Sequence, residues 1–194
     1  MKTEREVLAR SDRVLLGRFT IEDHAAVHTF ASDPQVCRYM SWGPNSESDT
    51  NEFLAQSIPV TPGRLNLAVI VDQAVIGSAS VWTTDNEHKN GELGYVLRAD
   101  HWGRGFATET ARLLLHLGAE HLDLERIAAT CDVENIASAR VLEKAGMHRE
   151  GIHRGHRLVR GERRDHLAFA WLVSPEGITV VEPTTSTSQT PRIG

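Results

Sequence analysis

Two glycines, Gly103 and Gly105, stand directly before a helical pattern and indicate a backbone that can bind an anion. Neither glycine has a Cβ, so the main chain can approach a ligand closely at this turn. Apolar residues then recur at helical spacing from Ala107 to Leu117. The unpaired N–H groups and the positive dipole end of that helix favour a phosphate or pyrophosphate ligand.

Three kinds of phosphate-binding turn can be compared with this one. A Walker loop requires a Gly-Lys-Ser/Thr triplet, which the sequence lacks. A dinucleotide fingerprint requires a third glycine, where this chain has Thr108. The pattern that remains is the pyrophosphate loop of acyl-coenzyme A binders, Arg/Gln-x-x-Gly-x-Gly/Ala, filled here by residues 102–107 with Trp102 at its first position. Alone, this hexapeptide also fits an ordinary helix start.

The elements that would position this turn follow from hydrophobic periodicity and from turn residues. Strands are expected at residues 13–18, 64–71, 75–84, 91–97, 126–132, 147–159 and 163–173. Helices are expected at residues 20–32, 48–58, from the glycine turn to about 120, and at 135–144. The order strand, helix, strand around residues 91–132 predicts a parallel pair in an otherwise antiparallel sheet. Ligands of such sheets bind where neighbouring strands part, which is where the glycine turn lies.

Composition restricts the class of protein. A net charge of −5 over 194 residues, without a lysine or arginine block, gives no indication of nucleic-acid binding. The start is charged and no apolar run has the length of a membrane span, so a cytoplasmic protein is expected. We expect Cys37 and Cys131 to be buried free thiols, and the histidines show no metal-ligand spacing.

The chain is expected to consist of one folded domain between two other segments. Residues 1–12 are predicted to be an N-terminal lead, and residues 13–173 the folded domain. Residues 174–194, rich in Pro, Thr and Ser, are predicted to be a disordered tail.

Several strings together resemble the GNAT superfamily of acyl-CoA-dependent N-acetyltransferases, and in particular its RimJ/RimL-like branch, which acetylates protein N-termini. They are Glu-Leu-Gly-Tyr-Val-Leu at 92–97, Trp-Gly-Arg-Gly-Phe-Ala-Thr-Glu at 102–109, Arg-Ile-Ala-Ala at 126–129 and the run at 135–146. The resemblance implies an α/β (α+β) GNAT fold: a mixed, mostly antiparallel sheet of about seven strands, a central parallel pair splayed around acyl-CoA, and about four helices.

The resemblance also implies how acetyl-CoA would be held as acyl donor. Backbone N–H groups of the turn would bind the pyrophosphate, and a bulge in the 91–97 strand would free backbone groups for the pantetheine arm and the acetyl carbonyl. Asn135 would contact the pantetheine, although it also fits a plain helix cap. The cofactor residues implied are Tyr95, Val96, Leu97, Trp102, Gly103, Arg104, Gly105, Phe106, Ala107, Thr108, Asn135 and Ser138.

The chemistry needs a base for the amine and an acid for the leaving thiolate. Glu92, on the central strand, is the first candidate base, and His156 is the second. The usual thiolate acid of the superfamily, a tyrosine on the 135–144 helix, is missing, so Ser138 takes that role by its resemblance to the RimL-like branch. Glu92 also fits a solvent-facing strand residue, and Ser138 a small residue packed against the cofactor.

The function that follows is transfer of an acetyl group to a primary amine, by direct attack in a ternary complex. The acceptor is a protein N-terminus or a small molecule, bound by Tyr39, Trp42, Trp82 and Glu92; no metal, nucleic acid or membrane is implied. The resemblance also allows a homodimer. The alternative is a catalytically idle GNAT domain that binds acyl-CoA as a sensor or interaction module.

Overall fold

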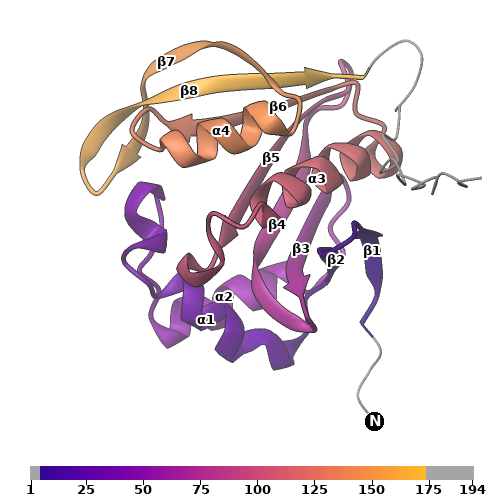
Figure 1. Ribbon diagram of the computed structural model, residues 1–194, viewed down its shortest axis with the longest axis vertical. Helices are drawn as coiled ribbons and strands as arrows, with labels where there is room; N and C mark the ends of the chain where they lie inside the picture. Colours follow the sequence, from indigo (N-terminus) through magenta and orange to yellow (C-terminus); the bar gives the residue numbers. More distant parts are fainter. Residues whose placement is uncertain (1–4, 174–194) are drawn as a thin grey trace, which may run out of the picture.

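The computed structural model describes residues 5–173, which form one mixed sheet with helices on both faces (Figure 1). The sheet has eight strands in the order β1-β2-β3-β4-β5-β6-β8-β7, and β5 with β6 is its parallel pair. The strands are β1 (Val7–Arg10), β2 (Leu15–Arg18), β3 (Arg64–Val71), β4 (Ala74–Asp85), β5 (Asn90–Leu97), β6 (Arg126–Asp132), β7 (His148–Val159) and β8 (Glu162–Leu172). The predicted mixed sheet is confirmed, with one strand more than expected.

Four α-helices cover the sheet, as predicted. They are α1 (His24–Ala31), α2 (Glu47–Ser57), α3 (Phe106–Leu122) and α4 (Ile136–Lys144), with short 3₁₀ turns at Ile21–Asp23, Val36–Tyr39 and Ala99–His101. Helices α3 and α4 lie against one face of the sheet, and α1 and α2 pack together on the other (Figure 1).

Alternation along β3 shows how two cores form on one sheet. Leu67 and Val69 point to the core under α3, whereas Ala68 and Ile70 point to the core under α1 and α2. Successive side chains of a strand face opposite sides, so a strand covered on both faces is apolar throughout. The run from Leu65 to Val71 is therefore apolar at nearly every position.

Two tight hairpin turns set the register of the strand pairs that they join. Asp72 and Gln73 join β3 to β4 with φ of 49° and 65°, and Arg160 and Gly161 join β7 to β8 with φ of 48° and 86°. Positive φ at both central residues is the signature of a two-residue turn that matches strand twist. Both turns were predicted at these residues.

The segment predicted to be a lead before the domain contributes the eighth strand. β1 pairs antiparallel with β2, and Arg5 forms a bidentate ion pair with the buried Asp23 at 2.6 and 2.8 Å. Arg5 lies against Gly17, where a Cβ would come within 2.9 Å of the Arg5 Cδ. Strand β1 is short and partly exposed, so its pairing depends on these tertiary contacts rather than on a hydrophobic pattern.

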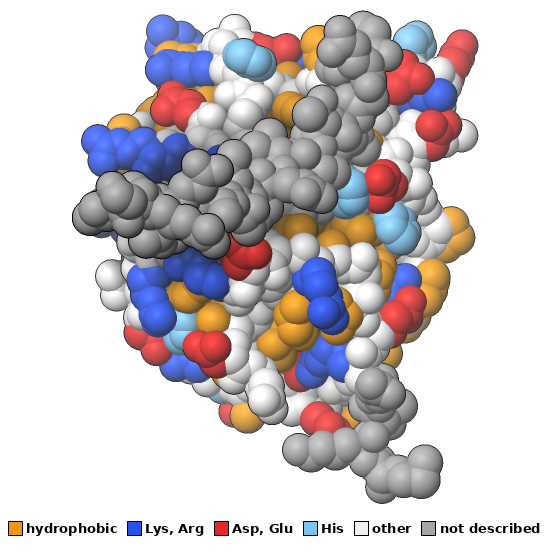
Figure 2. All heavy atoms as spheres, turned by 45° about the vertical axis from the view of Figure 1, so that its right-hand side comes forward, with side chains coloured by type: hydrophobic (Ala, Val, Ile, Leu, Met, Phe, Trp, Pro, Cys, Tyr) orange, Lys and Arg blue, Asp and Glu red, His pale blue; other side chains and the backbone are white. Residues whose placement is uncertain are grey.

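Charges of both signs are interspersed on the surface. On the face shown in Figure 2, Lys and Arg side chains lie among Asp and Glu side chains rather than in a region of one sign. Within residues 5–173, no helix combines the length and the apolar character that crossing a membrane requires. The predicted tail at 174–194 lies outside the described residues.

Candidate active site

The parallel strands β5 and β6 separate after a short common stretch. Their last paired residues are Glu92 and Ala128, although β5 continues to Leu97 and β6 to Asp132. A cavity of about 770 Å³ follows this gap. Its walls include Phe30 of α1 on one face of the sheet and Ser138 of α4 on the other, so the cavity connects the two faces.

The free backbone of β5 faces this gap at alternate residues. The Arg98 N–H donates to the Ile76 carbonyl of β4 at 2.8 Å, and antiparallel pairs alternate, so Val96 also turns its backbone groups to β4. A Cβ on Gly77 of β4 would indeed lie 2.1 Å from the Val96 carbonyl oxygen. The backbone groups of Tyr95 and Leu97 therefore face β6, whereas those of Val96 face β4. Val96 lines the cavity, and its predicted contact with a ligand stays a prediction.

The predicted bulge in β5 is also wrong. The register between β4 and β5 is continuous from Leu97 to Gly91, and its shift lies between Thr83 and Asp85 of β4. The strands thus part without an extra residue in β5. The gap is opened by β6, which leaves β5 while remaining paired with β8 along its whole length.

The glycine turn presents a run of free N–H groups, as expected. Gly103 and Gly105 have φ of 73° and 88°, and a Cβ on Gly103 would meet no atom within 4 Å. Within residues 5–173, none of the N–H groups of residues 103–107 has a backbone acceptor outside α3. Thr108 differs from the prediction, because its N–H donates to the Gly105 carbonyl at 3.0 Å.

Two arginines lie close to the ring of Phe106, the first residue of α3. The guanidinium carbons of Arg104 and Arg13 lie 4.8 and 5.0 Å from the Phe106 ring centroid. Arg13 also pairs with Glu109, in the first turn of α3, whereas Arg104 has no ion-pair partner among the described residues. The Phe106 ring is buried in the core, so only its backbone can contact a ligand at the turn.

Trp102 fixes the turn to the end of β5. Its indole N–H donates to the Leu97 carbonyl at 2.9 Å, and the ring is 45% exposed. That carbonyl faces the gap, where β6 offers it no partner, and the indole supplies a donor in its place. The tryptophan in the first position of the loop motif therefore links the turn to the end of β5.

Three side chains meet on the α4 side of the gap. The Tyr95 hydroxyl lies 3.1 Å from the Ser138 hydroxyl, and Cys131 lines the cavity beside them. Burial raises the pKa of the Tyr95 hydroxyl, and it raises the pKa of the Cys131 thiol to about 11. Both groups are thus protonated at neutral pH. Cys37 and Cys131 are free and buried, as predicted.

Asn135 begins α4 by capping it. Its side-chain oxygen accepts the Ser138 N–H at 3.1 Å, which is the helix-cap role predicted as one of two alternatives. Asn135 also lines the cavity, so its amide group remains available on that side.

Glu92 lies in the cavity on the other side of the gap, directly opposite Trp82 of β4. Arg157 approaches it at 3.3 Å. Burial raises the pKa of the Glu92 carboxyl, and this effect outweighs Arg157 and Arg64, which lower it. The Arg64 guanidinium carbon lies 4.7 Å from the Trp82 ring centroid. Two arginines, Arg64 and Arg157, therefore lie near the Glu92 carboxyl.

His156, the second candidate base, does not line the cavity. The register of β7 against β8 shifts between His153 and Arg157, and Gly155 has a φ of 54° there. The Gly155 N–H donates to Asp165 at 2.7 Å, which holds this bulge. His156 is exposed there, and its ring centroid lies 5.0 and 5.4 Å from those of His153 and His166, in tilted and edge-on orientations.

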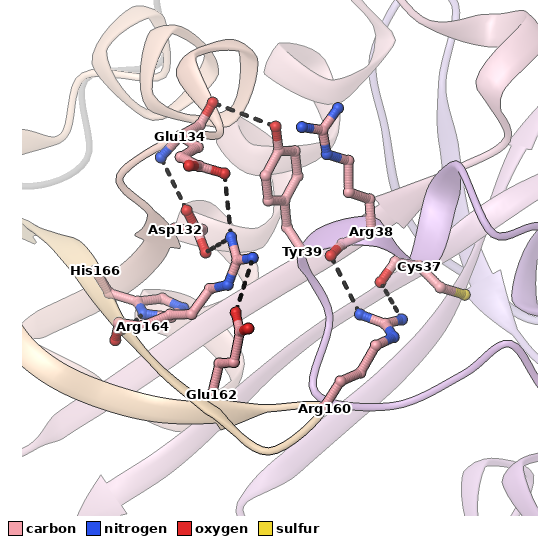
Figure 3. Close-up of polar contacts among 9 residues, drawn as sticks. All are labelled: Cys37, Arg38, Tyr39, Asp132, Glu134, Arg160, Glu162, Arg164 and His166. Carbon is pink, nitrogen blue, oxygen red and sulfur yellow. Dashed lines mark hydrogen bonds and ion pairs between the residues drawn. The ribbon is translucent and has the colours of Figure 1, made fainter.

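His166 is the histidine that the structure brings to the cavity. It is 3% exposed and stands opposite Asp132 in the pairing of β8 with β6 (Figure 3). Burial lowers the pKa of its imidazole, which is therefore neutral near pH 7. Arg164 approaches the Asp132 carboxylate at 3.5 Å. Gly155, a glycine inside a predicted strand, was the sequence signal for the register shift in β7.

The remaining predicted acceptor residues lie in the loop before α2. Tyr39 and Trp42 line the cavity together with Met40. The Tyr39 hydroxyl donates to the Glu134 carbonyl at 3.4 Å, which links this loop to the segment before α4 (Figure 3). The structure thus brings Tyr39, Trp42, Trp82 and Glu92 to one cavity.

Known proteins share both the sequence and this architecture. Residues 13–148 match the family model described as an acetyltransferase (GNAT) domain. An uncharacterised N-acetyltransferase of Bacillus subtilis, YnaD, is 32% identical over 72% of this chain and 82% of its own length. A GNAT-family acetyltransferase from Bacillus anthracis is 32% identical, with a TM-score of 0.77 over 84% of this chain and 96% of its own.

RimL, the ribosomal L7/L12 alpha-N-protein acetyltransferase, has the same fold. Its TM-score is 0.77 at 19% identity, over 87% of this chain and 95% of RimL. The family model spans most of the chain, including the glycine turn and both strands of the gap, and the chain therefore belongs to the GNAT family of acetyltransferases.

Proposed function

We propose that this protein transfers an acetyl group from acetyl-CoA to a primary amine, by direct attack of the amine on the thioester in a ternary complex. The observation that carries the proposal is the cavity along the β5–β6 gap. It has Glu92 on the side of α1 and α2 and Ser138 on the side of α4. An amine and a thioester can thus enter from opposite faces of the sheet and meet between the two strands.

The residues of the glycine turn fit the pyrophosphate of coenzyme A. Among the described residues, the N–H groups of 103–107 have no acceptor outside α3 and Arg104 has no ion-pair partner; these groups and the dipole of α3 all favour an anion at this place. RimL, whose fold the chain shares, is described in a complex with coenzyme A. The chemistry that bound acetyl-CoA supplies is a thioester carbonyl that an amine can attack.

Backbone groups of β5 would hold the donor along the gap. The N–H groups of Tyr95 and Leu97 face β6 without a strand partner there. Donors aimed at a carbonyl oxygen stabilise the negative charge that develops on it during attack. Asn135, at the opposite wall, can donate from its side-chain amide.

Glu92 and Ser138 are assigned to proton transfer at the two ends of the reaction. The raised pKa of Glu92 brings a carboxylate base closer to neutral pH, where a base is most effective. Ser138 can donate to a leaving thiolate, and its hydroxyl is in turn within hydrogen-bond distance of the Tyr95 hydroxyl at 3.1 Å. His156 has no part in this assignment.

The acceptor side of the cavity suits an amine with an apolar or aromatic neighbouring group. Its walls combine aromatic rings, such as Phe53 and Trp82, with the carboxylates of Glu52 and Glu92. The carboxylates favour an ammonium group and the rings favour apolar surface. Both a peptide N-terminus and a small aromatic amine meet this description. A homodimer and a cytoplasmic location stay predictions, since the chemistry requires neither.

Two measurements test the proposal. Calorimetric titration with acetyl-CoA should give micromolar binding, with NAD and ATP binding at least tenfold more weakly. Thiol release should then be followed with 2-phenylethylamine and with the tetrapeptide amide Ser-Ala-Phe-Leu-NH₂ as acceptors. Acetylation of either amine, lost on Glu92→Gln or Ser138→Ala, supports the proposal. Binding of acetyl-CoA without turnover of any amine would favour the idle acyl-CoA-binding domain.

A further inference from the structure

Residues 37–43 form a closed loop that stands over the acceptor side of the cavity. Its two ends touch, because a Cβ on Gly43 would lie 2.6 Å from the Cys37 Sγ. Outside this neck, the Asn45 N–H donates to the Ala31 carbonyl at 2.9 Å. Between the ends, the loop carries Tyr39 and Trp42 to the cavity wall. The position of these rings therefore depends on what holds the neck.

Arg160, at the tip of the β7–β8 hairpin, reaches this neck from the other side of the cavity. Its guanidinium donates to the carbonyls of Cys37 at 2.9 Å and Arg38 at 3.3 Å, which belong to the first end of the loop (Figure 3). It also donates to the carbonyl of Gly43 at 3.4 Å, at the second end. One side chain, 117 or more residues away in sequence, thus joins both ends of the loop.

The chemistry of these contacts requires an arginine. A guanidinium has several N–H donors in a rigid plane and no acceptor, so it can serve three carbonyls at once. A lysine ammonium has a compact charge on a flexible stem and cannot reach all three in the same way. The backbone of Arg160 has a φ of 48°, a conformation that glycine or asparagine normally takes in such a turn.

We propose that Arg160 is a positioning residue that closes the neck of the 37–43 loop and thereby sets the acceptor wall of the cavity. Its role in acceptor binding rests on the proposed acetyltransferase function. Its role in holding the loop rests on the three hydrogen bonds alone. Arg160 thus affects which acceptor binds by holding the loop in place, and it does not itself contact the acceptor.

Limited trypsin digestion tests the loop directly. Arg38 lies in the loop and is exposed, so a loosened neck opens the bond after it to the protease. Cleavage after Arg38, followed by mass spectrometry, should be at least fivefold faster in Arg160→Ala than in the unchanged protein, and intermediate in Arg160→Lys. Arg163→Ala is the matched control, because Arg163 donates at 3.1 Å to Gly155 within its own hairpin and does not contact the loop.

Steady-state kinetics test the consequence for the acceptor. With the better of the two amines named above, Arg160→Ala should raise the acceptor KM at least fivefold. The affinity for acetyl-CoA should stay within twofold and kcat within threefold, and Arg163→Ala should match the unchanged protein. Equal cleavage rates in Arg160→Ala and Arg163→Ala would overturn the proposal, as would faster cleavage with an unchanged acceptor KM. If the unchanged protein acetylates neither amine, the proposed function fails, and the cleavage rates still decide whether Arg160 holds the loop.

Discussion

The Tyr95 hydroxyl lies 3.1 Å from the Ser138 hydroxyl, and this contact spans the gap between β5 and α4. The superfamily tyrosine expected on the helix at 135–144 is missing, yet a phenol reaches the same wall from the strand. Burial raises the pKa of Tyr95, so the phenol keeps its proton and can donate to Ser138 at neutral pH. Ser138 is then free to donate its own proton into the cavity.

Removing the Tyr95 hydroxyl tests this arrangement. We expect Ser138→Ala to lower kcat about 100-fold, at the lower end of the range that general acid catalysis contributes, and Tyr95→Phe to lower it about 10-fold, because the phenol acts only through Ser138. The double variant should be no slower than Ser138→Ala, because the two hydroxyls would act as one unit. Thiol-release kinetics at saturating acetyl-CoA measure these values.

Tyr39→Phe is the matched control for the loss of a hydroxyl from the same cavity. Its hydroxyl contacts the Glu134 carbonyl at 3.4 Å, away from Ser138, so kcat should change less than threefold. A full kcat in Tyr95→Phe beside a slow Ser138→Ala would show that Ser138 works without the phenol.

The pH dependence of the reaction should report Glu92. A base must be deprotonated to act, and burial raises the pKa of Glu92, so the acid limb of kcat/KM should fall above the usual pKa of a glutamate. Glu92→Gln should lower kcat/KM at least 100-fold and remove this limb. An unchanged acid limb in Glu92→Gln would assign the titration to another group.

Removing Arg157 tests whether the acid limb follows the pKa of Glu92. Its guanidinium lies 3.3 Å from Glu92 and favours the charged form. Arg157→Gln should therefore raise the pKa of Glu92 further and move the acid limb to higher pH, with kcat at high pH within fivefold. Arg154→Gln, on the same strand and paired with Asp165 at 3.5 Å, should leave the limb where it is.

Much of the fold followed from local pattern. The alternation in residues 91–97, the helical spacing after Gly105 and the turn residues at 72–73 and 160–161 predicted elements that the structure contains. The parallel pair followed from the order of elements, because a crossover helix requires it. The glycine turn was predictable from its residues, since glycine permits the positive φ that Gly103 and Gly105 adopt.

The parts that sequence could not predict depend on contacts between distant residues. Strand β1 exists because Arg5 pairs with Asp23 and because β2 offers a free edge. His156 does not line the cavity, and the register of β7 shifts beside it at Gly155, whose N–H donates to Asp165 of the next strand. The Tyr95 side chain meets Ser138 only once β5 and β6 have separated, and no local spacing contains that distance.

The anion site can be tested by comparing substitutions at two glycines that both have a positive φ. Gly103 and Gly146 have φ of 73° and 97°, and a Cβ would meet no atom within 4 Å at either. Alanine should cost each about 1 kcal/mol of stability through its backbone. Gly103→Ala should also weaken acetyl-CoA binding at least fivefold by calorimetry, whereas Gly146→Ala, after α4, should leave it unchanged. Equal affinities in the two variants would make the turn a helix start only.

The contribution of the first strand can be tested by stability. Arg5 makes a bidentate pair with Asp23, whose side chain is 6% exposed, and also donates to the Arg18 carbonyl at 2.7 Å. Arg5→Ala leaves a buried carboxylate with fewer donors, which should cost about 2 kcal/mol and lower Tm by about 4–8 °C. Arg10 is an exposed residue of the same strand without an ion pair in the described residues, so Arg10→Ala should change Tm by less than about 1 °C.

A chain shortened to begin at residue 13 should be destabilised at least as much as Arg5→Ala, because it loses the pair and the edge strand together. An equal Tm for the shortened and the full chain would place the boundary of the domain at residue 13 after all.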